Sequence, residues 1–236
     1  MRRASALALV LALLGGCKAK PSKAADPAVA QGAQQYARLC ATCHGKEGNG
    51  YIADNAPSLR TTTFLSSASD PFLRAAIARG RPGTAMAAYG NFFGGPLQMP
   101  EIDAIIAFLR AGGPKPVVLP PRPATGDAKA GKMLFDMMCV RCHGTPTQRS
   151  SAVHLASPVL LQTASDAFLR YAVENGRPPT SMVPWKDTLR PQQIDDVVAY
   201  LRSLAAPARP RPPPPAPPKP APRKGPVVLN PRGRAP

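Results

Sequence analysis

The sequence predicts an all-α fold made of two tandem copies of one helical unit, followed by a disordered proline-rich tail. Two observations lead to this prediction. The motif Cys-x-x-Cys-His occurs twice, at residues 40–44 and 139–143, and further matching segments follow each occurrence. Apolar residues around both motifs also recur every three or four positions, which is the spacing of an amphipathic helix. The 236 residues are enough for two small domains.

The matching segments define the repeat. Residues 69–74 (SDPFLR) match 165–170 (SDAFLR), and residues 80–86 (GRPGTAM) match 176–182 (GRPPTSM), at an offset of 96 residues. The two Cys-x-x-Cys-His motifs lie 99 residues apart, so the second copy lacks three residues in the loop after its histidine. The expected parts are a signal peptide (1–16), a linker (17–26), a first domain (27–111), a proline-rich linker (112–125), a second domain (126–204) and a tail (205–236).

Three helices are expected in each copy. The first should span about 27–43 and 127–142, the middle one 70–80 and 166–176, and the last should begin near Pro100 and Pro191. The middle helices are predicted to have Asp70 and Asp166 as N-caps, because a side-chain oxygen there can accept hydrogen bonds from free backbone N–H groups.

Residues 1–16 have the features of a secretory signal: two arginines, then a short apolar run, then two glycines before Cys17. The residues 14–17 (LGGC) resemble a bacterial lipobox, which implies that Cys17 is lipidated and becomes the first mature residue. An ordinary signal peptide with a chance cysteine is the alternative. We therefore expect a lipid-anchored protein on the periplasmic side of a membrane in a bacterial cell envelope, with inner and outer membrane both open.

The formal net charge of +17 invites a nucleic-acid function, but the position of the charge excludes it. Residues 26–112 hold seven basic and six acidic residues, and residues 126–204 hold nine and seven. The excess lies in the leader, the linkers and the tail. The tail is rich in proline, alanine, arginine and lysine, a composition that cannot build a core, and we expect it to be disordered.

The two Cys-x-x-Cys-His motifs carry the chemistry. Cys40, Cys43 and His44 form the first. Cys139, Cys142 and His143 form the second. Two thiols about one helical turn apart can bond the two vinyl groups of one porphyrin, and the next residue offers a neutral imidazole to the iron. Structural disulfides and a zinc site are the competing interpretations, and the long separation of the two pairs disfavours zinc. The motifs therefore predict two covalent haem c groups.

With these motifs in place, each copy resembles a class I cytochrome c domain, and the pair resembles the di-haem cytochromes of the c4 type. The resemblance covers residues 27–111 and 126–204. It implies that the first and last helices of each copy cross closely, with a small residue facing an aromatic one. Gly32 with Phe108, and Gly131 with Tyr200, match these roles.

The resemblance also implies a methionine as the sixth iron ligand. Met86 and Met182 occupy equivalent positions of the repeat and are the expected ligands. Met99, which precedes a proline as the family's ligand usually does, is the alternative for the first haem. His154 is the spare histidine, and we expect it at the surface.

A proline carbonyl is the further feature that the resemblance implies. It accepts a hydrogen bond from the second ring nitrogen of the haem-ligating histidine and so fixes the orientation of the ring. Pro57 and Pro158 follow their histidines by 13 and 15 residues and are the candidates, although loop prolines without this role are the alternative.

A methionine on each iron would leave no open position for substrate, which suits electron transfer more than catalysis. We expect an electron carrier of a bacterial respiratory chain, with a membrane or periplasmic donor and an oxidase or reductase as acceptor. The alternatives are a haem subunit of a larger oxidoreductase or oxidase complex and, third, a haem enzyme.

Overall fold

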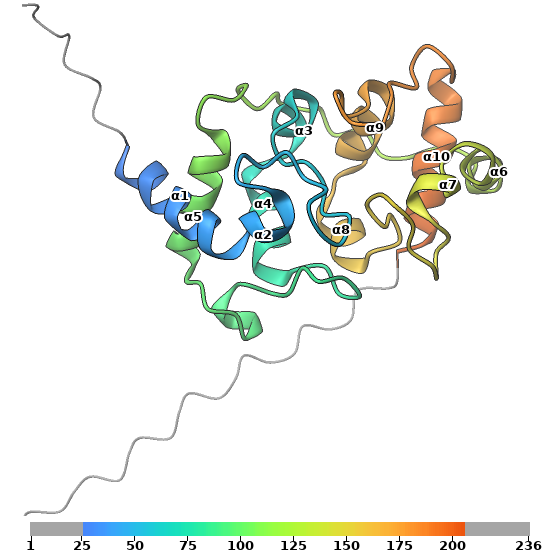
Figure 1. Ribbon diagram of the computed structural model, residues 1–236. Helices are drawn as coiled ribbons and strands as arrows, with labels where there is room; N and C mark the ends of the chain where they lie inside the picture. The colour runs from blue at the N-terminus through green and yellow to red at the C-terminus, as the bar shows by residue number, and fades with distance from the viewer. Residues whose placement is uncertain (1–25, 206–236) are drawn as a thin grey trace, which may run out of the picture. The chain divides into compact units, whose positions relative to one another are not determined.

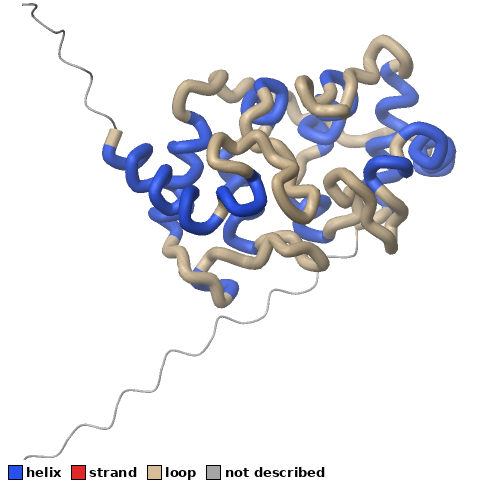
Figure 2. The backbone as a smooth tube through the Cα atoms, in the orientation of Figure 1, coloured by secondary structure: helices blue, strands red, loops and turns tan. Residues whose placement is uncertain are grey.

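The computed structural model describes residues 26–205 (Figure 1). The signal peptide, Cys17 and nearly all of the proline-rich tail therefore lie outside the described residues. All regular structure in the described part is helical, so the all-α prediction is confirmed, and long loops connect the helices (Figure 2). Within residues 26–205 no helix has the length and apolar character needed to cross a membrane.

Each copy contains five α-helices in the same order. The first copy has α1 (Pro27–Leu39), α2 (Ala41–His44), α3 (Thr62–Ser67), α4 (Asp70–Arg79) and α5 (Met99–Arg110), with a 3₁₀ turn, η1 (Asn91–Phe93), before α5. The second has α6 (Ala128–Met138), α7 (Val140–His143), α8 (Pro158–Thr163), α9 (Asp166–Asn175) and α10 (Pro191–Ser203). The short helices α3 and α8 were not expected from the sequence.

Two predicted details of the helices are wrong. The predicted first helices each divide into two, because Cys40 and Cys139 leave the regular helical geometry with φ near −112° and −113°. The N-caps of α4 and α9 are Ser69 and Ser165, not Asp70 and Asp166. The serine hydroxyls accept hydrogen bonds from Phe72 N and Phe168 N at 3.3 and 3.1 Å, and each aspartate follows in the first turn, where a negative charge favours the helix dipole.

The first and last helices of each copy cross with their backbones in contact. A Cβ atom added to Gly32 would lie 1.8 Å from the Ala104 oxygen, and one added to Gly131 would lie 1.8 Å from the Asp196 oxygen. The glycines thus face a backbone carbonyl directly. The predicted aromatic partners, Phe108 and Tyr200, pack at a tilt against aromatic rings of the first helix of their copy, with centroid distances of 5.0 and 5.2 Å.

One hydrophobic core extends across both copies. Phe72 of α4 and Phe168 of α9 stack with ring centroids 4.7 Å apart, and Leu160 of α8 belongs to the same buried cluster. Polar contacts accompany this packing, since the Thr63 hydroxyl donates to the Gly176 oxygen at 2.8 Å. The two copies therefore fold against one another, which fixes the loops of one copy beside those of the other.

Candidate haem sites

Each Cys-x-x-Cys-His motif forms a single helical turn at the end of the first helix of its copy. The backbone N–H of His44 donates to the Cys40 carbonyl oxygen at 2.9 Å, and the backbone N–H of His143 donates to the Cys139 carbonyl oxygen at 3.0 Å. This turn places two thiols and an imidazole within five consecutive residues. The four motif cysteines form no disulfide with one another, so the disulfide interpretation is wrong for these residues.

A backbone carbonyl orients each histidine. The Nδ1 atom of His44 lies 2.9 Å from the Pro57 oxygen, as predicted, and Nδ1 of His143 lies 2.7 Å from the Val153 oxygen. When Nδ1 carries the proton and donates it to a carbonyl, Nε2 keeps a free lone pair for a metal. Burial lowers the pKa of both histidines, against the opposing effect of these hydrogen bonds, and so favours the neutral imidazole that iron requires.

The prediction that Pro158 serves His143 is wrong. Pro158 is the first residue of α8, so its carbonyl lies at the start of a helix rather than in the loop. Val153 takes the role because the second copy lacks three residues in this loop, and the repeat offset of 96 carries Pro57 onto position 153. The sequence held this signal, since placing the deletion before residue 153 identifies the acceptor.

The two methionine turns are equivalent. The Arg81 N–H donates to the Met86 oxygen, and the Arg177 N–H to the Met182 oxygen, both at 2.8 Å. A threonine hydroxyl two residues earlier accepts from each methionine N–H, at 3.0 Å for Met86 and 3.3 Å for Met182. Met99 is instead the first residue of α5 and packs against the core cluster. This equivalence favours Met86 over Met99, and the ligand assignment stays a prediction.

Comparison with known proteins now decides the family. The family model for cytochrome c oxidase, cbb3-type, subunit III matches residues 27–109 and 126–201, which are the two copies. The chain belongs to this family. It is a class I c-type cytochrome with two haem c groups.

Two curated relatives agree with this assignment. The chain is 27% identical to the cbb3-type cytochrome c oxidase subunit CcoP of Azospirillum sp. (strain B510) over 195 residues, covering 75% of this cytochrome and 62% of the relative. It is 30% identical to the cbb3-type cytochrome c oxidase subunit FixP of Bradyrhizobium sp. (strain ORS 278) over 185 residues, covering 74% and 60%. The cytochrome thus matches somewhat under two thirds of each relative's length.

A solved structure also matches. It is a chain of the reducing HAO-like protein complex of Kuenenia stuttgartiensis, with 18% identity and a TM-score of 0.44, covering 75% of this cytochrome and 96% of that chain.

The residues around the motif turns fit haem better than a thiolate-bound metal. Burial, and to a lesser extent the neighbouring thiol, raises the pKa of Cys40 and of Cys139 to about 11. In residues 26–205 no group of three or more histidine, cysteine or acidic side chains is placed to hold a metal ion. Each turn supplies instead two thiols for thioether bonds and one imidazole for iron.

Two arginines missed in the sequence also fit the carboxylates that haem carries. Arg81 and Arg177 begin the methionine turns at equivalent positions of the repeat, and burial lowers the pKa of each to about 10. They stack on Phe72 and Phe168 at 5.8 and 5.4 Å, and neither takes part in an ion pair among the described residues. A partly desolvated cation without a carboxylate suits an anionic ligand group. The repeated Gly-Arg-Pro sequence was the available signal.

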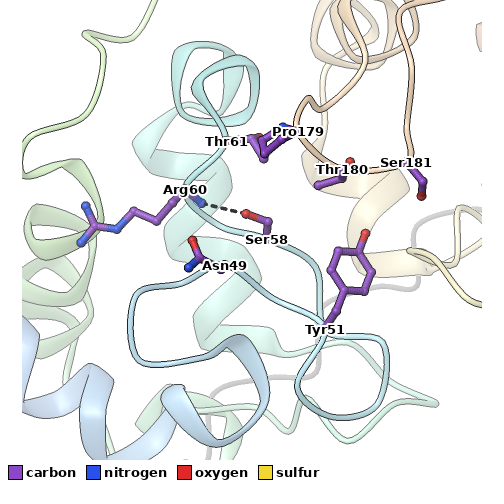
Figure 3. Close-up of a pocket in the computed structure, with 8 residues that line it drawn as sticks. All are labelled: Asn49, Tyr51, Ser58, Arg60, Thr61, Pro179, Thr180 and Ser181. Carbon is purple, nitrogen blue, oxygen red and sulfur yellow. Dashed lines mark hydrogen bonds between the residues drawn. The ribbon is translucent and has the colours of Figure 1, made fainter.

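A cavity of about 390 Å³ opens between the two copies (Figure 3). Its lining is Asn49, Tyr51, Ser58, Arg60 and Thr61 of the first copy and Pro179, Thr180 and Ser181 of the second. The Tyr51 ring extends toward Thr180 and Ser181, which belong to the Met182 turn. The lining offers hydroxyl and amide groups and no carboxylate, whereas the Arg60 guanidinium points away from the cavity and donates to the Ala111 oxygen at 2.9 Å.

His154 lies in the loop after the second motif. Its Nε2 atom is 2.9 Å from the Thr145 oxygen, so the side chain is engaged in holding this loop together. The sequence predicted a surface position for this histidine, and the structure places it partly buried.

Proposed function

We propose that this cytochrome is the electron-transfer subunit of a larger membrane oxidoreductase, of the oxidase type that its relatives' names describe. The expectation of an independent respiratory carrier becomes the second candidate. The observation that carries the proposal is the duplication of a complete set of candidate ligands, since two equivalent motif turns and two equivalent methionine turns occur in copies that pack on one another through Phe72 and Phe168. Two such sites in one compact unit suit the relay of electrons more than the binding of a substrate.

The residues have distinct tasks in this proposal. When bound, haem supplies an iron that alternates between the ferrous and ferric states and so passes one electron at a time. His44 and His143 would each offer Nε2 to the iron, because their Nδ1 atoms are hydrogen-bonded to backbone carbonyls. Met86 and Met182 would each supply a thioether ligand, which would keep water and substrate off the iron. Because both turns are hydrogen-bonded, little structure has to move when the charge of the site changes.

Spectroscopy and reactivity of the isolated cytochrome test the carrier role. We expect both oxidised haems to show the weak absorption near 695 nm that marks a methionine–iron bond, and the ferrous protein to bind no carbon monoxide. High-spin haem that binds carbon monoxide and reduces peroxide at a catalytic rate would contradict the proposal and favour a haem enzyme.

Co-purification separates a subunit from an independent carrier. Membranes of the native host, solubilised in mild detergent, should yield the tagged cytochrome together with an oxidase or reductase subunit in a fixed ratio. Recovery of the cytochrome by itself, with reduction and oxidation by soluble partners, would favour the independent carrier.

We also propose that a lipid on Cys17 holds the protein to the periplasmic side of a membrane. The proposal is supported by the residues 14–17, which match a lipobox. The Cys17→Ser variant should shift from the membrane fraction to the soluble fraction of the periplasm. An unchanged distribution would refute the lipid anchor without affecting the electron-transfer proposal.

A further inference from the structure

The methionine turn of the first copy is held by a carboxylate from outside the turn. The N–H of Ala85, the residue before Met86, donates to Oδ2 of Asp54 at 2.7 Å. Asp54 lies in the loop between the first motif and Pro57, the carbonyl of which orients His44. One carboxylate therefore links the loop on the histidine side to the turn that carries the methionine.

Arg149 of the second copy fixes this carboxylate. Its Nη2 atom donates to Oδ1 of Asp54 at 2.9 Å and to the Asp54 carbonyl at 3.2 Å, and its Nη1 atom donates to the Gly83 oxygen at 3.1 Å. The guanidinium thus contacts both Asp54 and the methionine turn itself. We call this arrangement of Asp54, Arg149, Gly83 and Ala85 the interdomain latch.

The backbone around Arg149 is tied to the second haem motif. The Ser150 hydroxyl donates to the Arg141 oxygen at 2.9 Å, and the Ala152 N–H donates to the Cys142 oxygen at 2.8 Å. The Asn55 amide also donates to the Ser150 oxygen at 3.3 Å, beside the latch. The latch therefore connects the motif of one haem to the methionine turn of the other through a short series of hydrogen bonds.

The loop that carries Asp54 needs such support. Tyr51, Asp54 and Asn55 all have positive φ, of 60°, 47° and 52°. Residues other than glycine rarely adopt this backbone conformation, and they keep it only where surrounding contacts compensate for the strain. The contacts to Arg149 and Ser150 provide that compensation.

The second copy has no matching latch. Ser181 occupies the position of Ala85, and among residues 26–205 no side-chain carboxylate accepts a hydrogen bond from its N–H. Pro184 follows Met182 by two residues and restricts the backbone of that turn, whereas Ala87 and Ala88 follow Met86. The first turn therefore depends on outside contacts in a way that the second does not.

We propose that Arg149 is a positioning residue for the first haem. Through Asp54 and Gly83 it holds the Met86 turn in place, so that the thioether of Met86 stays on the iron, and it makes this ligation depend on the folded loop of the second haem site. The inference rests on the proposed role of Met86 as the sixth ligand. Its consequence is selective: weakening the latch affects the first haem and leaves the second unchanged.

The test uses the full-length cytochrome with both haems attached. Arg149→Ala removes the latch, Arg149→Lys keeps the charge without the forked contact, and Arg74→Ala is the control, because Arg74 and Asp103 form a comparably exposed ion pair away from the haem loops. Two signals are followed at each haem. They are the ring-current-shifted methionine methyl resonances of the reduced protein, assigned with Met86→Ala and Met182→Ala, and the affinity of the ferric protein for imidazole, which competes with methionine for iron.

We expect Arg149→Ala to raise the affinity of the first haem for imidazole roughly two- to fivefold, which is the scale of a partly exposed ion pair. The imidazole affinity of the second haem should stay at the wild-type value, as should both affinities in the Arg74→Ala control. Arg149→Lys should show most of the increase at the first haem. The Met86 methyl resonance should broaden or shift in Arg149→Ala, with that of Met182 unchanged.

Three results would overturn the latch. They are no difference between Arg149→Ala and the control, an equal change at both haems, or full rescue by Arg149→Lys, which would mean that charge alone acts. If Met86→Ala removes neither methyl resonance, the ligand assignment itself fails and the latch with it. This last result is distinguishable, because the other three arise with the Met86 signal present.

Discussion

The same arginine–aspartate pair occurs in both copies, exposed in the first and buried in the second. Arg74 of α4 bonds Asp103 of α5 with side chains 35% and 48% exposed. Arg170 of α9 bonds Asp195 of α10 at equivalent positions, with side chains 6% and 5% exposed. The linker between the copies accounts for the lower exposure of the second pair. Nη2 of Arg122 donates to Oδ2 of Asp195 at 2.8 Å, and the Arg122 carbonyl accepts a hydrogen bond from Nη1 of Arg170 at 3.2 Å.

This difference shows that equal sequences in a duplicated protein acquire unequal energetic roles. A solvated pair gains little from its attraction, because water competes for both charges. A buried pair has lost its water, so each charge depends on the other. Substitutions at this pair should therefore lower the free energy of unfolding more in the second copy than in the first.

The largest expected effect is the loss of the buried ion pair, which tests the difference between the two copies directly. Asp195→Ala leaves the buried Arg170 guanidinium without its carboxylate and should lower the free energy of unfolding by about 3–5 kcal/mol. Asp103→Ala, the matched change in the first copy, should cost about 0–1 kcal/mol. Urea unfolding of both variants, followed by far-UV circular dichroism, measures the two values. Equal losses would show that the linker does not desolvate the second pair.

The next effect should be the same in both copies. Gly32→Ala and Gly131→Ala each place a methyl group against a backbone carbonyl of the crossing helix, at 1.8 Å in the present geometry. Each should cost about 1–3 kcal/mol as the helices move apart. The control Ala37→Ser alters an exposed position of α1 and should change stability by less than about 0.5 kcal/mol. Thermal unfolding that spared one glycine variant would contradict equal packing at the two crossings.

A smaller effect is expected at an arginine that makes the same hydrogen bonds in both copies. Arg110 donates to the Leu65 and Ala68 carbonyls, both at 2.5 Å, and pairs with Asp70; Arg202 does the same with the Leu161 and Ala164 carbonyls and Asp166. Arg110→Lys and Arg202→Lys keep the charge but cannot reach all acceptors, so each should cost about 1–2 kcal/mol. Denaturant midpoints of the two variants should agree within error, and a large difference would show that the two contacts are not equivalent.

The smallest expected effect concerns the histidine acceptors. Pro158→Ala should leave the reduction potential of the second haem unchanged, because the carbonyl that faces His143 belongs to Val153. Redox titration followed in the visible spectrum measures this potential. A clear shift in Pro158→Ala, with none in the control Pro146→Ala, would restore Pro158 as the acceptor.

Much of the site was readable from the sequence because local chemistry fixes it. The motif turns need only five consecutive residues, so their spacing predicted the thiols and the imidazole. The repeat likewise predicted that Met86 and Met182 occupy equal turns, which the hydrogen bonds to Arg81 and Arg177 confirm. The helix N-caps were missed by one residue, because serine and aspartate are both good caps and only backbone geometry separates them.

The sequence by itself determined that the chain holds two copies of one Cys-x-x-Cys-His unit and predicted the haem ligands, since the motif residues are consecutive and both motif and methionine repeat. Tertiary structure decided what lies around them. Three contacts show this: His143 with the Val153 carbonyl, Arg122 of the linker with Asp195, and Arg149 with Asp54. The residues in these pairs lie about 10 to more than 90 positions apart in the sequence. Such contacts depend on how loops close and on how the two copies pack, and a backbone carbonyl that accepts a hydrogen bond leaves no mark on the identity of its residue.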